Sequence, residues 1–129
     1  MSKFQELFDK MVRGLSSQGW GQSMAEHGVM GTCAYRGRGG RRCAIGWLIP
    51  DDRYDERMDK EDMSADNYAV RGVVDPDGDP DLSTFLSLCQ LSHDAADSRD
   101  PEQMQHKFIH LAERYRLAWP ADVSKDVAK

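Results

Sequence analysis

The first apolar positions of the chain recur at the spacing of an amphipathic helix. Between residues 3 and 15 they fall at i, i+3, i+4 and i+7, so they line one side of a helix. The members of this stripe are Phe4, Leu7, Phe8, Met11, Val12 and Leu15. Ser2 is a suitable N-cap, and Gly19 and Gly21 end the pattern. We therefore predict a first helix with one buried face.

Two further helices are predicted in the last third of the chain. The first follows an acidic loop in which Asp81 is a candidate N-cap, and its apolar side consists of Leu82, Phe85, Leu86, Cys89 and Ala96. The second has Asp100 as N-cap and Pro101 at its first position. Its stripe consists of Met104, Phe108, Leu111, Ala112 and Tyr115. We expect these two helices to pair antiparallel and to pack on the first helix.

The middle of the chain has a weaker pattern. Glycines at 37, 39 and 40 supply the positive φ angles of tight turns, which predicts a β-hairpin over residues 33–43. Residues 43–49, CAIGWLI, are apolar almost throughout and fit either a short buried helix or a buried strand. Residues 59–81 are acidic and rich in turn formers, with a short helix expected over residues 64–70.

These elements together predict a mainly α (α+β) fold. It has four to five helices and one small β-hairpin at residues 33–43. The length of 129 residues fits one globular domain, which we place at residues 1–120. Residues 121–129 are expected to form a frayed C-terminal tail.

Charge and composition exclude some classes of function. The formal net charge of −5 argues against a general nucleic-acid coat and against adsorption to an anionic membrane. No apolar run approaches the roughly 20 residues that span a bilayer, and the start of the chain lacks the pattern of a signal peptide. The odd number of cysteines, three, is typical of a reducing compartment. We expect a cytoplasmic protein without membrane contact.

Against this acidic background, residues 33–50, CAYRGRGGRRCAIGWLIP, carry four arginines within seven residues. Either the acidic stretches 51–62 and 75–81 of the same chain neutralise them, or they contact an acidic protein surface or phosphates. An aromatic neighbour and the acids that follow complete the candidate surface. The candidate partner-binding residues are Tyr35, Arg36, Arg38, Arg41, Arg42, Asp51, Asp52, Asp55 and Glu56.

Signals for metal binding and catalysis are weak. Cys33, Cys43, Cys89 and His93 provide four soft ligands, but nine residues separate the first two, and buried cysteines are commonly core residues. His106 and His110, at i and i+4, lie toward the polar side of their helix and fit two solvated side chains better than a metal pair. Residues 75–81, DPDGDPD, lack the glycine and glutamate positions of an EF-hand. With no catalytic motif in the chain, we expect neither an enzyme nor a cofactor.

A longer motif surrounds the arginines: Cys33-x-Tyr35-Arg36-Gly37-x-x-Gly40-x-x-Cys43-Ala44-Ile45-Gly46-x-Leu48-Ile49-Pro50-Asp51-x-x-Tyr54. It resembles a pattern in a family of small uncharacterised proteins of bacterial genomes, phages and prophages. Relatives often carry Pro-Asp where this chain has Arg38-Gly39, so the extra arginine is its own. The resemblance implies no activity. It associates the chain with small acidic phage proteins that inhibit host defence, such as anti-CRISPR proteins.

The sequence leaves three hypotheses. The first is a non-enzymatic protein-binding module, phage- or prophage-encoded, that inhibits a host protein or ribonucleoprotein complex of defence. Acidic residues 51–62 would then stand in for phosphates, or else form an ordinary solvated surface. The second is binding of nucleic acid or a nucleotide through the arginine hairpin. The third is a small zinc protein.

Overall fold

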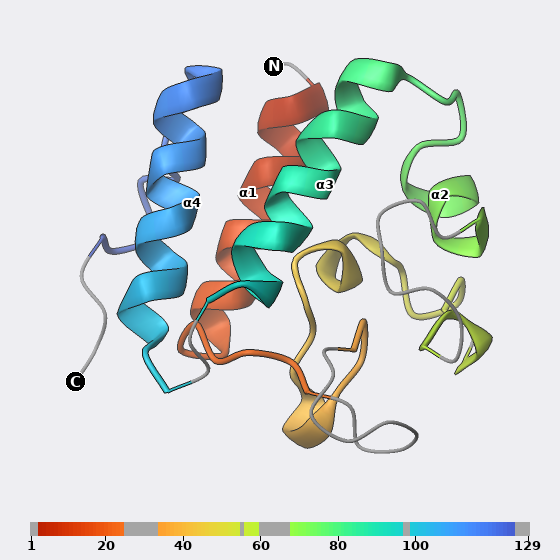
Figure 1. Ribbon diagram of the computed structural model, residues 1–129, viewed down its shortest axis with the longest axis horizontal. Helices are drawn as coiled ribbons and strands as arrows, with labels where there is room; N and C mark the ends of the chain where they lie inside the picture. Colours follow the sequence, from red (N-terminus) through yellow and green to blue (C-terminus); the bar gives the residue numbers. More distant parts are fainter. Residues whose placement is uncertain (1–2, 25–33, 55, 60–67, 97–98, 126–129) are drawn as a thin grey trace.

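The computed structural model describes residues 3–24, 34–54, 56–59, 68–96 and 99–125, and it is mainly helical, as predicted (Figure 1). The described residues form four α-helices: α1 (Lys3–Ser17), α2 (Tyr68–Val74), α3 (Pro80–Asp94) and α4 (Pro101–Tyr115). Three short 3₁₀ turns lie between α1 and α2: η1 (Arg38–Gly40), η2 (Ile45–Leu48) and η3 (Glu56–Asp59). Within these residues, no helix has both the length and the apolar character that a bilayer crossing requires.

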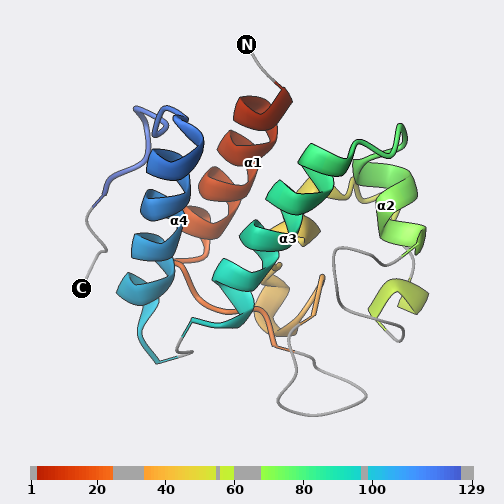
Figure 2. The ribbon, with the colours of Figure 1, turned by 45° about the horizontal axis from the view of Figure 1, so that its top comes forward.

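Helices α1, α3 and α4 form a three-helix bundle, in which α3 and α4 run antiparallel as predicted (Figures 1 and 2). Aromatic rings join the three helices in the core. Phe85 of α3 is fully buried, stacks on Phe4 of α1 at 4.9 Å between ring centroids, and meets the ring of Tyr115 of α4 at 4.8 Å. Phe8 packs against Phe108 at 6.4 Å. The buried faces follow the stripes that the spacing of apolar residues predicts.

The starts of α3 and α4 are set by aspartates followed by proline. Asp100 caps α4, since its carboxylate accepts the N–H of Gln103 at 3.3 Å. The cap of α3 is Asp79, whose carboxylate accepts the N–H of Asp81 at 2.9 Å. The prediction of Asp81 as the cap is therefore wrong. Pro80 takes the first helical position, where its missing N–H costs nothing, and this moves the cap two residues earlier.

The predicted hairpin over residues 33–43 is not found in the described residues 34–43. They contain one antiparallel bridge, between Arg36 and Arg42, and the turn η1 between these two residues. Cys33 lies outside the described residues. Gly39 and Gly40 do have positive φ angles, 65° and 76°. The ladder does not continue because the N–H of Tyr35, which would face Cys43, goes to the carboxylate of Asp59, while the carbonyl of Cys43 accepts the N–H of Trp47.

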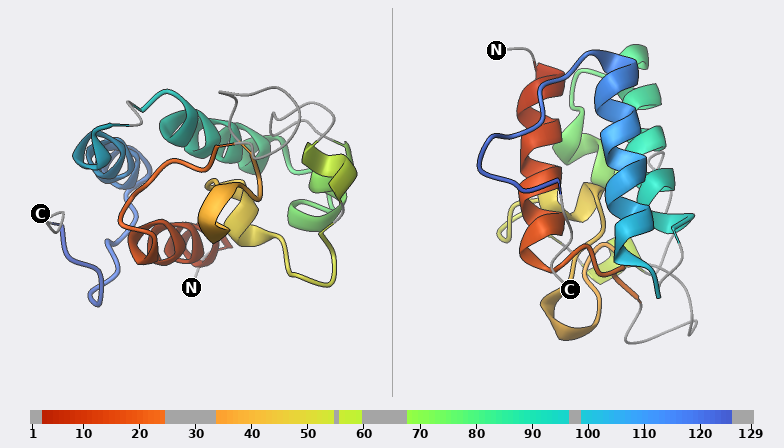
Figure 3. Two further views of the ribbon diagram at one scale, coloured as in Figure 1. Left: turned by 90° about the horizontal axis from the view of Figure 1, so that it is seen from below. Right: turned by 90° about the vertical axis from the view of Figure 1, so that its left-hand side faces the viewer.

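The apolar stretch 43–49, left open between helix and strand, forms the 3₁₀ turn η2. Ile45 and Ile49 are buried there, and η2 packs against both α1 and α3 (Figure 3). The short helix expected over residues 64–70 is found as α2, four residues further along at Tyr68–Val74. Residues 64–67 of that prediction lie outside the described residues.

The start of the predicted frayed tail is packed on the bundle. Val123 is buried, and Asp122 forms an ion pair with Arg13 of α1 at 3.0 Å. The amide of Gln105 in α4 donates to the carbonyl of Ser124 at 2.9 Å. The prediction of a frayed tail is thus wrong for residues 121–125, because Val123 supplies an apolar anchor there. Residues 126–129 lie outside the described residues.

Candidate functional site

Charged side chains gather where the turn 36–42 meets the turn that follows Pro50. We call this surface the charged corner and define it by the described side chains of Arg36, Arg41, Arg42, Asp51 and Asp52. The first three flank η1, and the two aspartates lie in a turn closed by hydrogen bonds from Arg53 and Tyr54 to the carbonyl of Pro50. Most of the candidate partner-binding residues therefore share one part of the fold.

Asp51 joins two of the arginines. Its Oδ1 accepts from Nη1 of Arg36 at 2.8 Å and from Nη2 of Arg42 at 3.0 Å. The hydrogen bond from Arg36, together with the charges of Arg36 and Arg42, holds the pKa of the Asp51 carboxyl below its usual value. The chain's own carboxylate thus neutralises part of the arginine cluster, which is one of the two alternatives left by the sequence.

Both arginines are also held by aromatic rings. The guanidinium of Arg36 lies 4.4 Å from the ring centroid of Tyr54, and that of Arg42 lies 4.8 Å from that of Trp47. Arg36 further donates from Nη2 to the carbonyl of Ile49 at 3.0 Å. Cation–π stacking and an ion pair together restrict each guanidinium to one position.

Two side chains distant in sequence hold the backbone of this turn. The carboxylate of Asp59 accepts the N–H of Tyr35 at 2.6 Å, the N–H of Arg36 at 3.3 Å and the hydroxyl of Tyr54. The amide of Gln18 accepts the N–H of Arg42 at 2.9 Å and donates to its carbonyl at 2.8 Å. The bond to Tyr35 takes a donor that strand pairing would use, and the bonds to Arg36 and Arg42 satisfy backbone groups on the outer edges of the bridge.

Replacing Asp59 by asparagine should loosen the charged corner. One carboxylate oxygen becomes an amide group that cannot accept a hydrogen bond, so at least one donor loses its partner, at a cost of about 1–2 kcal/mol. Amide exchange followed by NMR should be faster at Tyr35 and Arg36 in D59N. Asp52→Asn, at an exposed carboxylate, is the control and should leave both rates unchanged. Equal rates in all three proteins would contradict this role of Asp59.

Arg41 differs from Arg36 and Arg42. It is exposed, its guanidinium lies against the α-carbon of Gly21, and no ion pair to it is found in the described part of the chain. Its backbone carbonyl accepts the N–H of Gly37 at 2.9 Å and the hydroxyl of Ser23 at 3.2 Å. Arg41 therefore keeps its charge available to a partner.

Other residues of the predicted surface are placed differently. Tyr35 is completely buried among core residues, so its prediction as a partner-binding residue is wrong. The cause is the bridge at Arg36, which turns the preceding side chain inward. Asp55 lies outside the described residues, and so do the side chains of Arg38 and Glu56.

The soft ligands predicted for zinc serve the core instead. Cys43 and Cys89 are buried, and loss of solvation raises the pKa of both thiols. His93 is also buried; its Nε2 accepts the N–H of Ser23 at 3.0 Å, so Nδ1 carries the proton and donates to Asp94 at 2.7 Å. Both ring nitrogens are therefore engaged. In the described part of the chain no three potential metal ligands come together, and Cys33 lies outside it.

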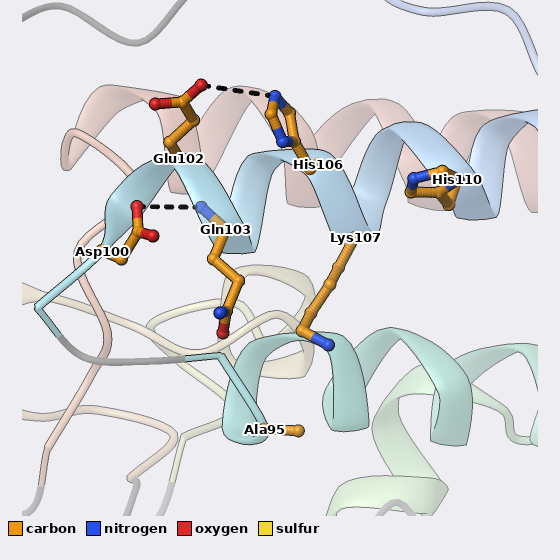
Figure 4. A pocket seen from close by; sticks show the side chains of 7 residues that line it. All are labelled: Ala95, Asp100, Glu102, Gln103, His106, Lys107 and His110. Atoms are coloured by element: carbon orange, nitrogen blue, oxygen red, sulfur yellow. Dashed lines mark hydrogen bonds and ion pairs between the residues drawn. The ribbon is translucent and has the colours of Figure 1, made fainter.

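An open pocket of about 700 Å³ lies along the first turns of α4 (Figure 4). Its lining consists of Ala95, Asp100, Glu102, Gln103, His106, Lys107 and His110. His106 and His110 are exposed, as predicted, and Nε2 of His106 lies 3.7 Å from the carboxylate of Glu102. Because these side chains are solvated and none belongs to the charged corner, the pocket adds no catalytic group to it.

Sequence reasoning missed the internal roles of Gln18 and Asp59. Asp59 stands within the acidic run 51–62, where nothing distinguishes it from its solvated neighbours. Comparison of the chain with family models, with curated proteins and with solved structures finds no match.

Proposed function

We propose that this chain is a non-enzymatic protein-binding module and that the charged corner is its binding surface. The observation that supports this is the combination of rigidity and exposed charge. Asp59, Gln18 and two stacked arginines fix the backbone, while Arg41, Asp51 and Asp52 remain exposed. A surface that is already ordered loses less entropy on binding.

The mixture of charges favours a protein partner over a nucleic acid. Nucleic-acid binding needs unpaired cations that replace counterions along the phosphates. Here the exposed carboxylates of Asp51 and Asp52 lie among the arginines, and the whole chain has a net charge of −5. Alternating positive and negative groups instead give specificity toward a complementary protein surface.

The narrower form of this proposal concerns the partner. The resemblance of residues 33–54 to proteins of phages and prophages supports an inhibitor, similar to anti-CRISPR proteins, that binds a host protein or ribonucleoprotein complex of defence. The acidic composition also supports an inhibitor of this kind, because carboxylates can occupy a channel that binds phosphates. Binding, and not catalysis, would then be the whole activity.

Capture of a partner by matched variants tests the proposal. The tagged protein is incubated with nuclease-treated bacterial lysate, and stoichiometric partners are identified and then purified for titration calorimetry. Arg41→Ala with Asp52→Ala removes one charge of each sign from the charged corner, and should weaken binding about tenfold or more. Neither side chain has an ion pair in the described part of the chain, so the fold should be unchanged.

The control is Glu113→Ala with Arg114→Ala, which removes the same two charges from exposed positions of α4. It should bind the partner like the wild type. If both double variants bind equally well, the charged corner is not the interface. If only nucleic acid is captured when nuclease is omitted, and raised salt releases it, the proposal of a protein partner fails and nucleic-acid binding replaces it.

A further inference from the structure

The arrangement around Asp51 has the form of an occupied anion site. Two guanidinium groups converge on the same oxygen, Oδ1, at 2.8 and 3.0 Å. Each comes from a different side of the bridge 36–42, and each is stacked on its own aromatic ring. Convergent guanidinium groups with fixed planes are the usual way in which proteins hold a phosphate or a carboxylate.

The arginines and the aspartate differ in how firmly they are held. The side chains of Arg36 and Arg42 are 23% and 25% exposed, whereas that of Asp51 is 77% exposed. Asp51 lies in a turn, and in the described part of the chain its other carboxylate oxygen has no partner. Rotation about its Cα–Cβ bond is enough to remove the carboxylate and leave the arginines in place. Exposed ion pairs of this kind contribute little free energy, so such exchange is accessible.

Arg36 also has a hydrogen-bond donor that is not used. Its Nε is buried and has no acceptor among the described residues. Buried donors normally find an acceptor, and an unused one beside the ion pair leaves Arg36 able to donate a further hydrogen bond to an anion.

From these observations we infer that Arg36 and Arg42 form an oxyanion-binding fork, which Asp51 closes in the free protein and which a carboxylate or phosphate group of the partner opens by exchange. This inference rests on the proposed function, since it names the group by which the partner engages the charged corner. Asp51 would then be an internal stand-in for the partner's anion.

Inorganic phosphate and acetate are suitable probes, since they represent the two sources of the anion. Asp51→Ala empties the fork, and two facing guanidinium groups should then take up an external oxyanion. Asp52→Ala is the matched control, because it removes the same charge from the next residue and leaves the fork closed. Binding is followed by NMR through the side-chain Nε–H signals of Arg36 and Arg42, with chloride at equal ionic strength as reference.

We expect D51A to bind phosphate about tenfold more tightly than D52A. The Nε–H chemical shifts of both Arg36 and Arg42 should change on binding. A response to phosphate alone assigns a phosphate group of the partner to the fork, and a response to both probes extends the assignment to carboxylates. Affinities in D51A and D52A that agree within about twofold would overturn the inference.

Two further measurements keep the test decisive. Asp51→Asn retains an acceptor oxygen, so its gain in phosphate affinity over D52A should be smaller than that of D51A. This variant replaces D51A in the test if D51A does not fold. In the wild type, a high phosphate concentration should shift the same two arginine signals, and unchanged signals would again overturn the inference.

The outcomes of this test can be told apart from those that test the proposed function. If the Arg41 and Asp52 double variant loses partner binding but D51A does not bind phosphate, the oxyanion-binding fork is rejected. The charged corner then remains the proposed binding surface.

Discussion

Replacement of Phe85 by alanine should lower the free energy of unfolding by about 3–5 kcal/mol. Phe85 is fully buried, and its ring contacts Phe4 of α1 and Tyr115 of α4 at centroid distances of 4.9 and 4.8 Å. It therefore packs α3 against both other helices of the bundle. Alanine would remove these contacts and leave a cavity that the surrounding rings cannot fill. Urea unfolding followed by circular dichroism measures the loss.

The control for this prediction is on the same helix. Leu91 is 58% exposed, so Leu91→Ala should change the free energy of unfolding by no more than about 0.5 kcal/mol. A comparable loss in both variants would mean that the Phe4–Phe85–Tyr115 contacts are not a centre of the core.

Gly46→Ala should destabilise the protein by about 3 kcal/mol, for a steric reason. A β-carbon at position 46 would overlap the carbonyl oxygen of Tyr35 and lie 3.1 Å from its carbonyl carbon. These atoms belong to the backbone and cannot rotate away. The turn η2 would have to separate from the segment that carries Tyr35 and Arg36, and this would disturb the charged corner as well as the core.

Gly72→Ala provides a matched glycine. It lies within α2, and a β-carbon there meets no atom within 4 Å. Alanine in a helix is favoured over glycine, so this variant should be unchanged or more stable by up to about 1 kcal/mol. Thermal unfolding of the two variants under the same conditions compares them directly. Equal midpoints would contradict the close approach of η2 to Tyr35.

The helices could be predicted from sequence because their determinants are local. Apolar spacing sets the buried face of α1, and Asp100 with Pro101 sets the start of α4, all within a few residues. The hairpin could not be judged in this way. The N–H of Tyr35, which strand pairing would use, goes to Asp59, and Gln18 holds the backbone of Arg42; each bond joins residues 24 positions apart. Such long-range side-chain bonds leave no periodic pattern.

The candidate surface was predictable in part for the same reason. Clustering in sequence brings Arg36, Arg41 and Arg42 to one turn, and the turn after Pro50 brings Asp51 beside two of them. Arg36 and Arg42 face each other in the bridge and both pair with Asp51, whereas Arg41 is the next position along one strand, where side chains alternate between faces. The inward position of Tyr35 follows from that same register, which composition does not reveal.

The rigidity of the charged corner connects its stability to its proposed role. D59N and G46A act on the same turn by different means, since one removes hydrogen-bond acceptors and the other adds a clash. Both should weaken partner binding even though neither residue contributes an exposed charge to the surface. F85A, which acts on the bundle, should reduce stability and leave the affinity of the folded fraction unchanged.

The most direct test of the central claim is hydrogen–deuterium exchange of the chain, free and in complex with its captured protein partner. The account predicts added protection in residues 34–54, which carry the charged corner, and none on the exposed face of α4 around His106 and His110. Protection confined to α4, with exchange in residues 34–54 unchanged, would contradict the claim that the charged corner is the binding surface.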